Sequence, residues 1–204
     1  MLAIVDYGVG NLFSLCSSLK SLNHPAVVTS DPKEISAAER VILPGVGAFG
    51  DAAEKLRKTG LDTVVIEQAE SGKPLLGICL GMQLLFEKSY EFGEHAGLGL
   101  LRGSIVPMKG TIPEDLKIPQ MGWNSLILKG SHPLLRDVKE GDCVYFVHSY
   151  YAAGCDDSLI ASCDYGREIT AAVASDNVMG CQFHPEKSGK IGLSILKAFC
   201  EVPV

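Results

Sequence analysis

The stretch PLLGICLGMQLLF (residues 74–86) places one cysteine between two glycines, with an apolar run on each side. Residues 75–78 predict a buried strand, and the residues from Leu80 to Glu87 predict a helix that follows at once. A direct strand-to-helix turn of the form G-x-C-x-G is a version of the nucleophile elbow, in which the reactive residue has a strained backbone. The flanking glycines would relieve clashes with neighbouring chain at this turn.

Similar apolar runs in the rest of the first half alternate with helical patterns. The predicted strands are Leu2–Val5, Ala26–Thr29, Val41–Leu43 and Leu75–Ile78. The predicted helices are Asn11–Leu22, Asp51–Ser71 and Leu80–Glu87. Fully apolar strands that alternate with helices are typical of a parallel sheet covered on both faces.

The second half contains strand-like runs at short intervals, which predict antiparallel or mixed additions to the same sheet. These runs are Leu101–Met108, Ser125–Leu128, Cys143–Val147, Leu159–Cys163, Ile169–Ala174 and Val178–Phe183, and a last helix is predicted at Ile191–Phe199. We find no internal repeat and no linker. We therefore expect the α/β class, with one domain over residues 1–204, a mostly parallel central sheet and helices in the two outer layers.

Composition limits the possible partners and the compartment. The 204 residues are 47% hydrophobic and 21% charged, with a net charge of −6 and no basic block, which argues against nucleic acid or an anionic membrane as the main partner. The seven cysteines include no CxxC pair, and no Cys/His cluster has the spacing of zinc ligands. With no signal peptide or long apolar span, we expect a cytoplasmic protein with reduced thiols, no metal and no cofactor.

Cys79 is the candidate nucleophile of the elbow. At the start of the expected helix, unpaired N–H groups and the helix dipole would favour the thiolate over the thiol. The alternative is a core cysteine at the end of a strand, whose neighbouring glycines serve only the turn.

His184 is the candidate base because it ends an apolar strand in CQFHPE (residues 181–186). Residues i and i+2 of an extended backbone point to the same side, so the carboxylate of Glu186 can lie beside the imidazole and fix its tautomer. The alternative is a strand-end histidine beside a surface glutamate. His148, in VYFVHSYY, could line a pocket, and the remaining histidines are interpreted as loop residues: His24, His95 and His132.

Two glycine-rich segments follow predicted strands. ILPGVGAFGD (residues 42–51) could aim backbone N–H groups at the oxyanion of a tetrahedral intermediate, although glycines in such loops often serve only to turn the chain. YGVGN (residues 7–11) lacks the third glycine of the dinucleotide-binding fingerprint.

Three motifs, GICLGMQLLF, PGVGAFG and FHPEKSG, together resemble the class I (triad) glutamine amidotransferases and occur in that family's order. The resemblance implies a flavodoxin-like parallel α/β fold with a Cys-His-Glu triad, in which Cys79 is the nucleophile, His184 the acid and base, and Glu186 the residue that orients it. It also implies an oxyanion hole formed by Gly47 and the amide of Leu80. The residues expected to hold glutamine are Gln83, Glu91, His148, Ser149 and Tyr150.

Two further segments, PQMGWNSL (residues 119–126) and YFVHSYYA (residues 145–152), are similar to the glutaminase subunits of imidazole glycerol phosphate synthases. This resemblance implies a heterodimer with a (β/α)8-barrel cyclase subunit. That subunit would join the ammonia to a formimino ribonucleotide and give imidazole glycerol phosphate and aminoimidazole carboxamide ribonucleotide, a step of histidine biosynthesis. The residues expected to face this partner are Asn11, Trp123, Tyr145 and Lys187, and the alternative for Trp123 is an ordinary core ring.

Other functions stay open at this stage. The chain could be a stand-alone cysteine hydrolase or the glutaminase of another synthase. It could also be a non-enzymatic, redox-sensing protein of flavodoxin type whose Cys79 is oxidised, although such a sensor has no need of His184 or of the Gly47 loop. We further expect that the isolated subunit is nearly inactive and that docking flips the oxyanion loop into its working geometry.

Overall fold

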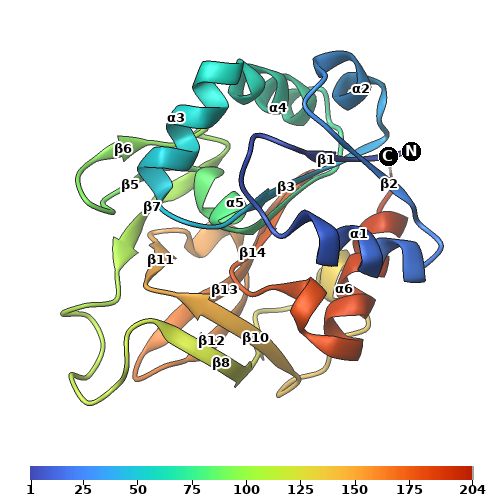
Figure 1. Ribbon diagram of the computed structural model, residues 1–204. Coiled ribbons are helices and arrows are strands. Elements are labelled where there is room, and N and C mark those ends of the chain that lie inside the picture. The colour runs from blue at the N-terminus through green and yellow to red at the C-terminus, as the bar shows by residue number, and fades with distance from the viewer. Residues whose placement is uncertain (204) are drawn as a thin grey trace.

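The main sheet has eight strands in the order β2-β1-β3-β4-β14-β13-β12-β9, in a computed structural model that describes residues 1–203 (Figure 1). Five of these strands run parallel: β1 (Leu2–Val5), β2 (Ala26–Thr29), β3 (Arg40–Gly45), β4 (Leu75–Cys79) and β14 (Val178–Cys181). Three antiparallel strands extend the sheet: β13 (Glu168–Ser175), β12 (Leu159–Asp164) and β9 (Ile127–Leu128).

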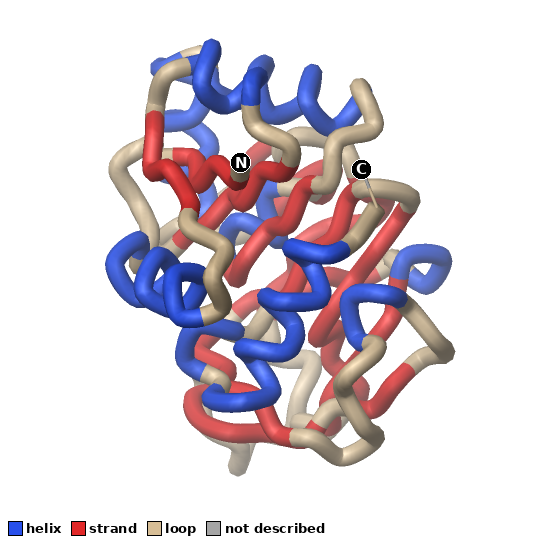
Figure 2. The backbone as a smooth tube through the Cα atoms, turned by 90° about the vertical axis from the view of Figure 1, so that its right-hand side faces the viewer, coloured by secondary structure: helices blue, strands red, loops and turns tan. Residues whose placement is uncertain are grey.

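Helices cover both faces of this sheet, as Figure 2 shows from the side. One face carries α1 (Leu12–Ser21) and α6 (Gly189–Glu201), and the other carries α2 (Pro32–Ala37), α3 (Phe49–Thr59) and α4 (Leu61–Glu70). Successive strand residues alternate between the two cores: Ile42 packs with α1 and α6, whereas Val41 and Leu43 pack with the other helices. The expectation of a mostly parallel sheet between helical layers is therefore confirmed.

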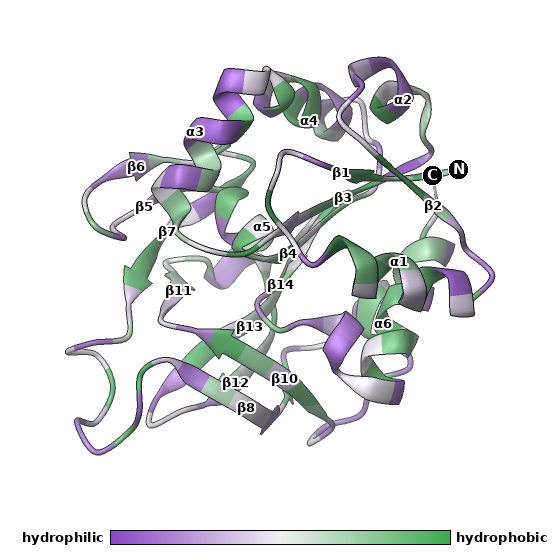
Figure 3. Ribbon diagram, viewed as in Figure 1, coloured by the Kyte–Doolittle hydropathy of each residue, from purple (hydrophilic) through white to green (hydrophobic). Residues whose placement is uncertain are grey.

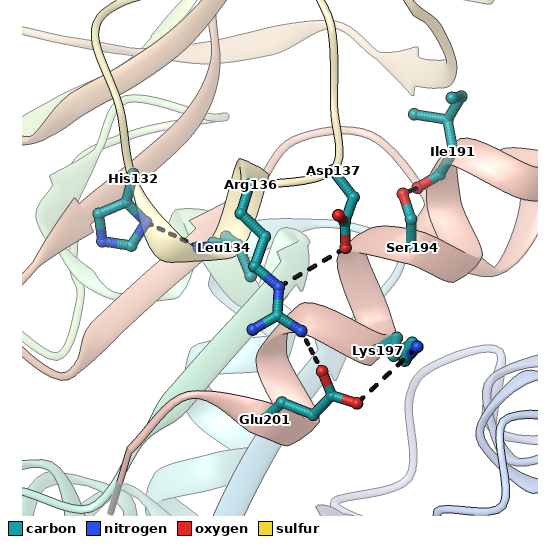
Figure 4. A network of polar contacts seen from close by, with 8 residues as sticks. All are labelled: His132, Leu134, Arg136, Asp137, Ile191, Ser194, Lys197 and Glu201. Atoms are coloured by element: carbon teal, nitrogen blue, oxygen red, sulfur yellow. Dashed lines mark hydrogen bonds and ion pairs between the residues drawn. The ribbon is translucent and has the colours of Figure 1, made fainter.

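Hydropathy follows the same arrangement. In Figure 3, β1 is hydrophobic along its length, whereas α3 carries hydrophilic residues on its outer side and buries Phe49 and Leu56 against the sheet. A polar contact also holds the C-terminal helix (Figure 4): Arg136, just after the 3-10 turn η1 (Pro133–Leu135), contacts Glu201 of α6 and also its own neighbour Asp137. The contact with Glu201 ties the segment after β9 to the last helix.

Two of the expected helices are shorter than the sequence suggested. The single helix expected over residues 51–71 is divided into α3 and α4, because Gly60 takes a left-handed conformation (φ +70°) that ends one helix and begins the next. The helix expected over residues 80–87 is α5 (Leu80–Leu84), and the chain then enters β5 (Phe86–Ser89). The short helix α2 was not predicted from the sequence, although Asp31 caps it by accepting a hydrogen bond from the Lys33 amide.

The predicted antiparallel additions to the main sheet are confirmed for β13, β12 and β9, whereas the other strands of the second half form two separate sheets. A separate four-stranded sheet has the order β11-β7-β5-β6, with β11 at Tyr150–Ala153, β7 at Leu101–Pro107 and β6 at His95–Ala96. β8 (Gln120–Ser125) and β10 (Cys143–His148) form a two-stranded ribbon, in the lower part of Figure 1. β10 buries alternate residues such as Val144 and Phe146, a pattern that suits a strand covered on one face only.

The described residues include no helix that is long and apolar enough to cross a membrane. Nor do residues 1–203 bring three His, Cys, Asp or Glu side chains together in a group that could hold a metal ion.

Candidate active site

Cys79 occupies the turn between β4 and α5 with a backbone that side chains rarely adopt. Its φ is +54° and its ψ is −111°, and such a conformation persists only where the surrounding structure holds it. The Cys79 side chain is buried but lies on the wall of a cavity. The structure therefore places Cys79 in the strained turn that the G-x-C-x-G pattern predicts.

The two flanking glycines are required by close approach of the chain. A Cβ atom added at Gly81 would lie 1.8 Å from the carbonyl oxygen of Leu43, and one added at Gly77 would lie 2.6 Å from the Cα atom of Met82. Neither clashing atom can move away easily, because the Leu43 carbonyl belongs to β3 of the main sheet and the Met82 Cα atom belongs to α5. The glycines thus allow β3, β4 and α5 to pack closely beneath the sulfur.

His184 and Glu186 follow β14, the strand next to β4 in the sheet. The Nδ1 atom of His184 lies 2.9 Å from Oε1 of Glu186, and both side chains are 3% exposed. The sequence predicted this contact from the alternation of an extended strand, but Pro185–Lys187 form a 3-10 turn, η3. The turn, rather than strand alternation, brings the carboxylate back to the imidazole.

The charge of His184 is governed by its two neighbours. Burial lowers the pKa of His184, but the hydrogen bonds and negative charges of Cys79 and Glu186 outweigh it and raise this pKa to about 9. The imidazolium form therefore dominates near neutral pH. α5 has only five residues, so the sulfur lies at the start of a single short helical turn whose N-terminus has no side-chain cap.

The loop after β3, which contains Gly47, lies on the same cavity as Cys79 and His184. Gly47 has a φ of +96°, and no atom lies within 4 Å of a Cβ added there, so glycine is required by the backbone conformation rather than by space. The start of this loop is fixed by Tyr7, whose buried hydroxyl donates to the carbonyl oxygen of Pro44 at 2.7 Å. Burial and then the Cys79 charge raise the pKa of Tyr7, which keeps this hydroxyl protonated.

A cavity of about 310 Å³ joins these parts. It is lined by Cys79 and His184, by the expected oxyanion residues Gly47 and Leu80, and by all five residues expected to hold glutamine. Those five are Gln83, Glu91, His148, Ser149 and Tyr150. Glu186 lies behind His184, beside a much smaller cavity that Asn11 also lines. Positions far apart in the sequence thus meet around one pocket of a size that suits a small ligand.

The main-chain carbonyl of Tyr150 organises the polar groups behind the cavity. It accepts hydrogen bonds from Nε2 of Gln83 at 3.1 Å and from Nδ1 of His148 at 2.8 Å. Burial, followed by the charge of His184, lowers the pKa of His148 to about 4 against the opposing effect of its bond to Tyr150. His148 is therefore neutral near pH 7 and carries its proton on Nδ1, because a carbonyl can only accept.

Glu91 reaches the cavity from the loop after β5. Its Oε2 atom accepts a hydrogen bond of 2.6 Å from the amide of Phe49, the first residue of α3. This bond holds the carboxylate at the cavity wall next to the Gly47 loop. Glu91 therefore supplies the negative charge on the side of the cavity that faces α3.

Three of the four residues expected at a partner interface lie on or near the outer face of the β8/β10 ribbon: Trp123, Tyr145 and Lys187. Trp123 is 58% exposed, which excludes the alternative of a core ring, and it pairs with Tyr145 across the ribbon. The Lys187 ammonium lies 5.9 Å from the centre of the Tyr145 ring. Asn11 lies elsewhere, just before α1, and lines the small cavity behind the His184–Glu186 pair.

The glutamine amidotransferase class-I family model matches residues 3–201. The chain belongs to this family.

As a class I glutamine amidotransferase, the chain is similar over nearly its full length to curated relatives. It is 52% identical to the imidazole glycerol phosphate synthase subunit HisH of Wolinella succinogenes, covering 99% of this chain and 100% of that relative. It is 53% identical to the subunit HisH of Caldanaerobacter subterraneus, covering 99% and 98%. Its fold is similar to that of PurLQS from Thermotoga maritima (TM-score 0.73, 23% identity, covering 98% and 96% of the two chains).

One polar residue of this amidotransferase site escaped the sequence analysis. Gln182 is fully buried, and its Nε2 atom lies 3.7 Å from the sulfur of Cys79. The sequence holds a local indication of this role, because Gln182 stands between the apolar residues Cys181 and Phe183, and a polar side chain buried in such a strand needs hydrogen-bond partners. Three apolar residues on the cavity wall were also not predicted from the sequence: Val46, Pro119 and Val147.

Proposed function

We propose that this amidotransferase is the glutaminase subunit of an imidazole glycerol phosphate synthase and releases ammonia from glutamine in the 310 Å³ cavity. The observation that carries the proposal is Cys79 in a strained turn, beside an imidazole held by a buried carboxylate. The full-length similarity to HisH subunits supports the choice of this synthase over others.

The chemistry follows from the protonation states. The Cys79 thiolate attacks the side-chain carboxamide carbon of glutamine, and the carbonyl oxygen becomes an oxyanion next to the Gly47 loop and Leu80. Collapse of this intermediate breaks the C–N bond, and the His184 imidazolium gives its proton to the departing nitrogen as ammonia leaves. Neutral His184 then takes a proton from water, which attacks the thioester and releases glutamate and the thiolate.

The ends of the cavity fit the two ends of the substrate. Glu91 offers a carboxylate for the α-ammonium group of glutamine, and its position is fixed by the Phe49 amide. Gln83 uses its amide nitrogen on Tyr150 and Gln182, so its oxygen is the atom left to accept a hydrogen bond from the substrate. We assign Ser149 and Tyr150 to the same wall of the glutamine site.

The partner in this proposal is a cyclase subunit with a (β/α)8 barrel, which uses the ammonia. The outer face of the β8/β10 ribbon suits a docking surface, because Met121 and Trp123 are 64% and 58% exposed there. This face is tied to the catalytic base, since the amide of His184 donates to the carbonyl of Tyr145 at 2.9 Å. Docking is proposed to flip the Gly47 loop, whose backbone only glycine adopts readily, so the isolated chain is nearly inactive.

The test is glutamate release by the complex of this chain with a cyclase subunit, with and without the cyclase ligand. We expect Cys79→Ala to lower glutamate release at least a thousandfold, while synthesis from added ammonium salt continues at the wild-type rate. Cys200→Ala, which removes a thiol near the end of α6 beside a cavity that no residue of the proposed active site lines, serves as the control and keeps glutamate release. Retained release in Cys79→Ala would refute the proposed nucleophile, and equal rates with and without the cyclase would refute the activation.

A further inference from the structure

The sulfur of Cys79 has a second polar neighbour besides His184. Nε2 of Gln182 lies 3.7 Å from the Cys79 sulfur, and Oε1 of Gln182 lies 2.9 Å from Nε2 of Gln83. Gln182 and Gln83 are both buried, at 0% and 5% exposure. The two amides form a continuous chain from the wall of the glutamine site to the nucleophile.

The orientation of both amides follows from one carbonyl. The oxygen of Tyr150 can only accept, so the Gln83 atom that lies 3.1 Å from it is the nitrogen. The second hydrogen of that nitrogen is directed to Gln182, whose facing atom must therefore be the oxygen. The remaining group of Gln182 is its NH₂, which faces the sulfur as a donor.

We propose that Gln182 is a positioning residue for the nucleophile: its amide donates a hydrogen bond to the Cys79 sulfur and holds the thiolate in place at the cavity wall. This inference rests on the proposed role of Cys79. An N–H donor favours the thiolate over the thiol, because a thiol accepts hydrogen bonds only weakly. α5 has only five residues, so Gln182 adds a side-chain donor to the few unpaired N–H groups at the start of this short helix.

The Gln182 donor has a separate task from that of His184. His184 gives its proton to the leaving ammonia and takes another from water, so its charge changes during the reaction. Gln182 keeps its hydrogen atoms throughout, so it holds the sulfur in one orientation while the thioester forms and is hydrolysed. Because Gln83 lines the glutamine site and fixes the amide of Gln182, the two glutamines also link substrate binding to the position of the sulfur.

The test is the rate of alkylation of Cys79 by iodoacetamide in the full chain at neutral pH. Trypsin releases Cys79 in the peptide of residues 59–88, in which it is the only cysteine, so mass spectrometry reads this site alone. Gln182→Glu keeps an acceptor for Gln83 but removes the donor, and Gln182→Met removes both. The matched control is Gln120→Met, which removes another buried glutamine that bonds a thiol, Cys163, at 3.6 Å.

We expect alkylation of Cys79 to slow about tenfold in Gln182→Met and further in Gln182→Glu, and to stay within about twofold of wild type in Gln120→Met. In the complex, the kcat for glutamate release should fall by a similar factor, with the KM for glutamine nearly unchanged. Wild-type alkylation rates in a folded Gln182 variant would overturn the proposal, and either variant suffices if the other does not fold. Alkylation needs no substrate, so it tests Gln182 separately from the glutaminase function, which Cys79→Ala tests.

Discussion

The imidazole of His184 and the carboxylate of Glu186 lie 2.9 Å apart and are both almost fully buried, although a proline stands between them in the chain. Pro185 begins a 3-10 turn, and this turn folds the carboxylate back onto Nδ1. The pair therefore presents Nε2 of His184 to Cys79 and the cavity.

Glu186→Gln should lower the kcat for glutamate release at least a hundredfold. The neutral amide no longer stabilises the imidazolium, and it can hold the imidazole in the wrong tautomer. The measurement is steady-state glutamate release by the complex, with synthesis from ammonium salt as the internal control. Activity within a few-fold of wild type would show that Glu186 has no part in orienting the base.

The pH dependence of kcat/KM should show a loss of activity as the pH rises through about 9. The raised pKa of His184 keeps the imidazolium, which protonates the leaving ammonia, below this pH, and the acid is lost above it. Glu186→Gln should move this limb to lower pH, because one of the causes that raise the pKa is removed. If the alkaline limb stays at the same pH in the variant, it reports the titration of a group other than His184.

Gly47→Ala and Gly81→Ala should fail in different ways. Gly47 has open space around an added Cβ but a φ of +96°, so its alanine variant should fold with a melting temperature within a few degrees of wild type and lose most glutaminase activity. At Gly81 the added Cβ would lie 1.8 Å from the Leu43 carbonyl, so this variant should lose several kcal/mol of stability or not fold. Thermal unfolding and glutamate release, measured on both variants, separate the two effects.

Trp123→Ala should weaken binding of the cyclase subunit at least thirtyfold while leaving the isolated chain as stable as wild type. The ring is 58% exposed and pairs edge-on with Tyr145, so its loss removes an interface anchor rather than core packing. Titration of one subunit with the other measures the affinity. Tyr90→Ala, at an aromatic residue that is 42% exposed after β5, is the control and should bind as wild type does.

Because of His148, the free energy of unfolding should decrease as the pH falls from about 6.5 to about 4. Its pKa is lowered to about 4 in the folded state, so over this range the unfolded chain binds a proton that the folded chain does not. A shift of about 2.5 pH units corresponds to about 3 kcal/mol of unfolding free energy. Urea unfolding of wild type and His148→Gln across this range should show a smaller decline in the variant, and identical declines would contradict the prediction.

The parallel half of the fold was predictable because its strands are buried on both faces and read as continuous apolar runs, as in β1 and β4. The separate sheets were not predictable, because a run such as Cys143–Val147 does not reveal which core it covers. The division of the helix at Gly60 had a local signal, a glycine followed by a new apolar pattern, that was not used. Pairing of distant strands depends on tertiary packing, which single-chain patterns do not contain.

For the site, the glycine elbow and the HPE segment were enough to locate Cys79, His184 and Glu186 around one place, since each has a local sequence signature. Gln182 was missed because its role depends on a contact with Gln83 and on a main-chain carbonyl of Tyr150. A carbonyl has no side-chain signature, so no pattern of residue types identifies it. Only the three-dimensional arrangement shows which polar groups are left to face the sulfur.

The position of β14 has a consequence for the biosynthesis of the enzyme. This strand lies in the interior of the sheet, between β4 and β13, yet it comes from the last part of the chain. A nascent polypeptide that has not yet emerged beyond Glu186 holds its thiol without a base, and the neighbouring strands have a gap between them. Translation must therefore pass Glu186 before Cys79 can meet its proposed base and before the gap at the centre of the sheet is filled.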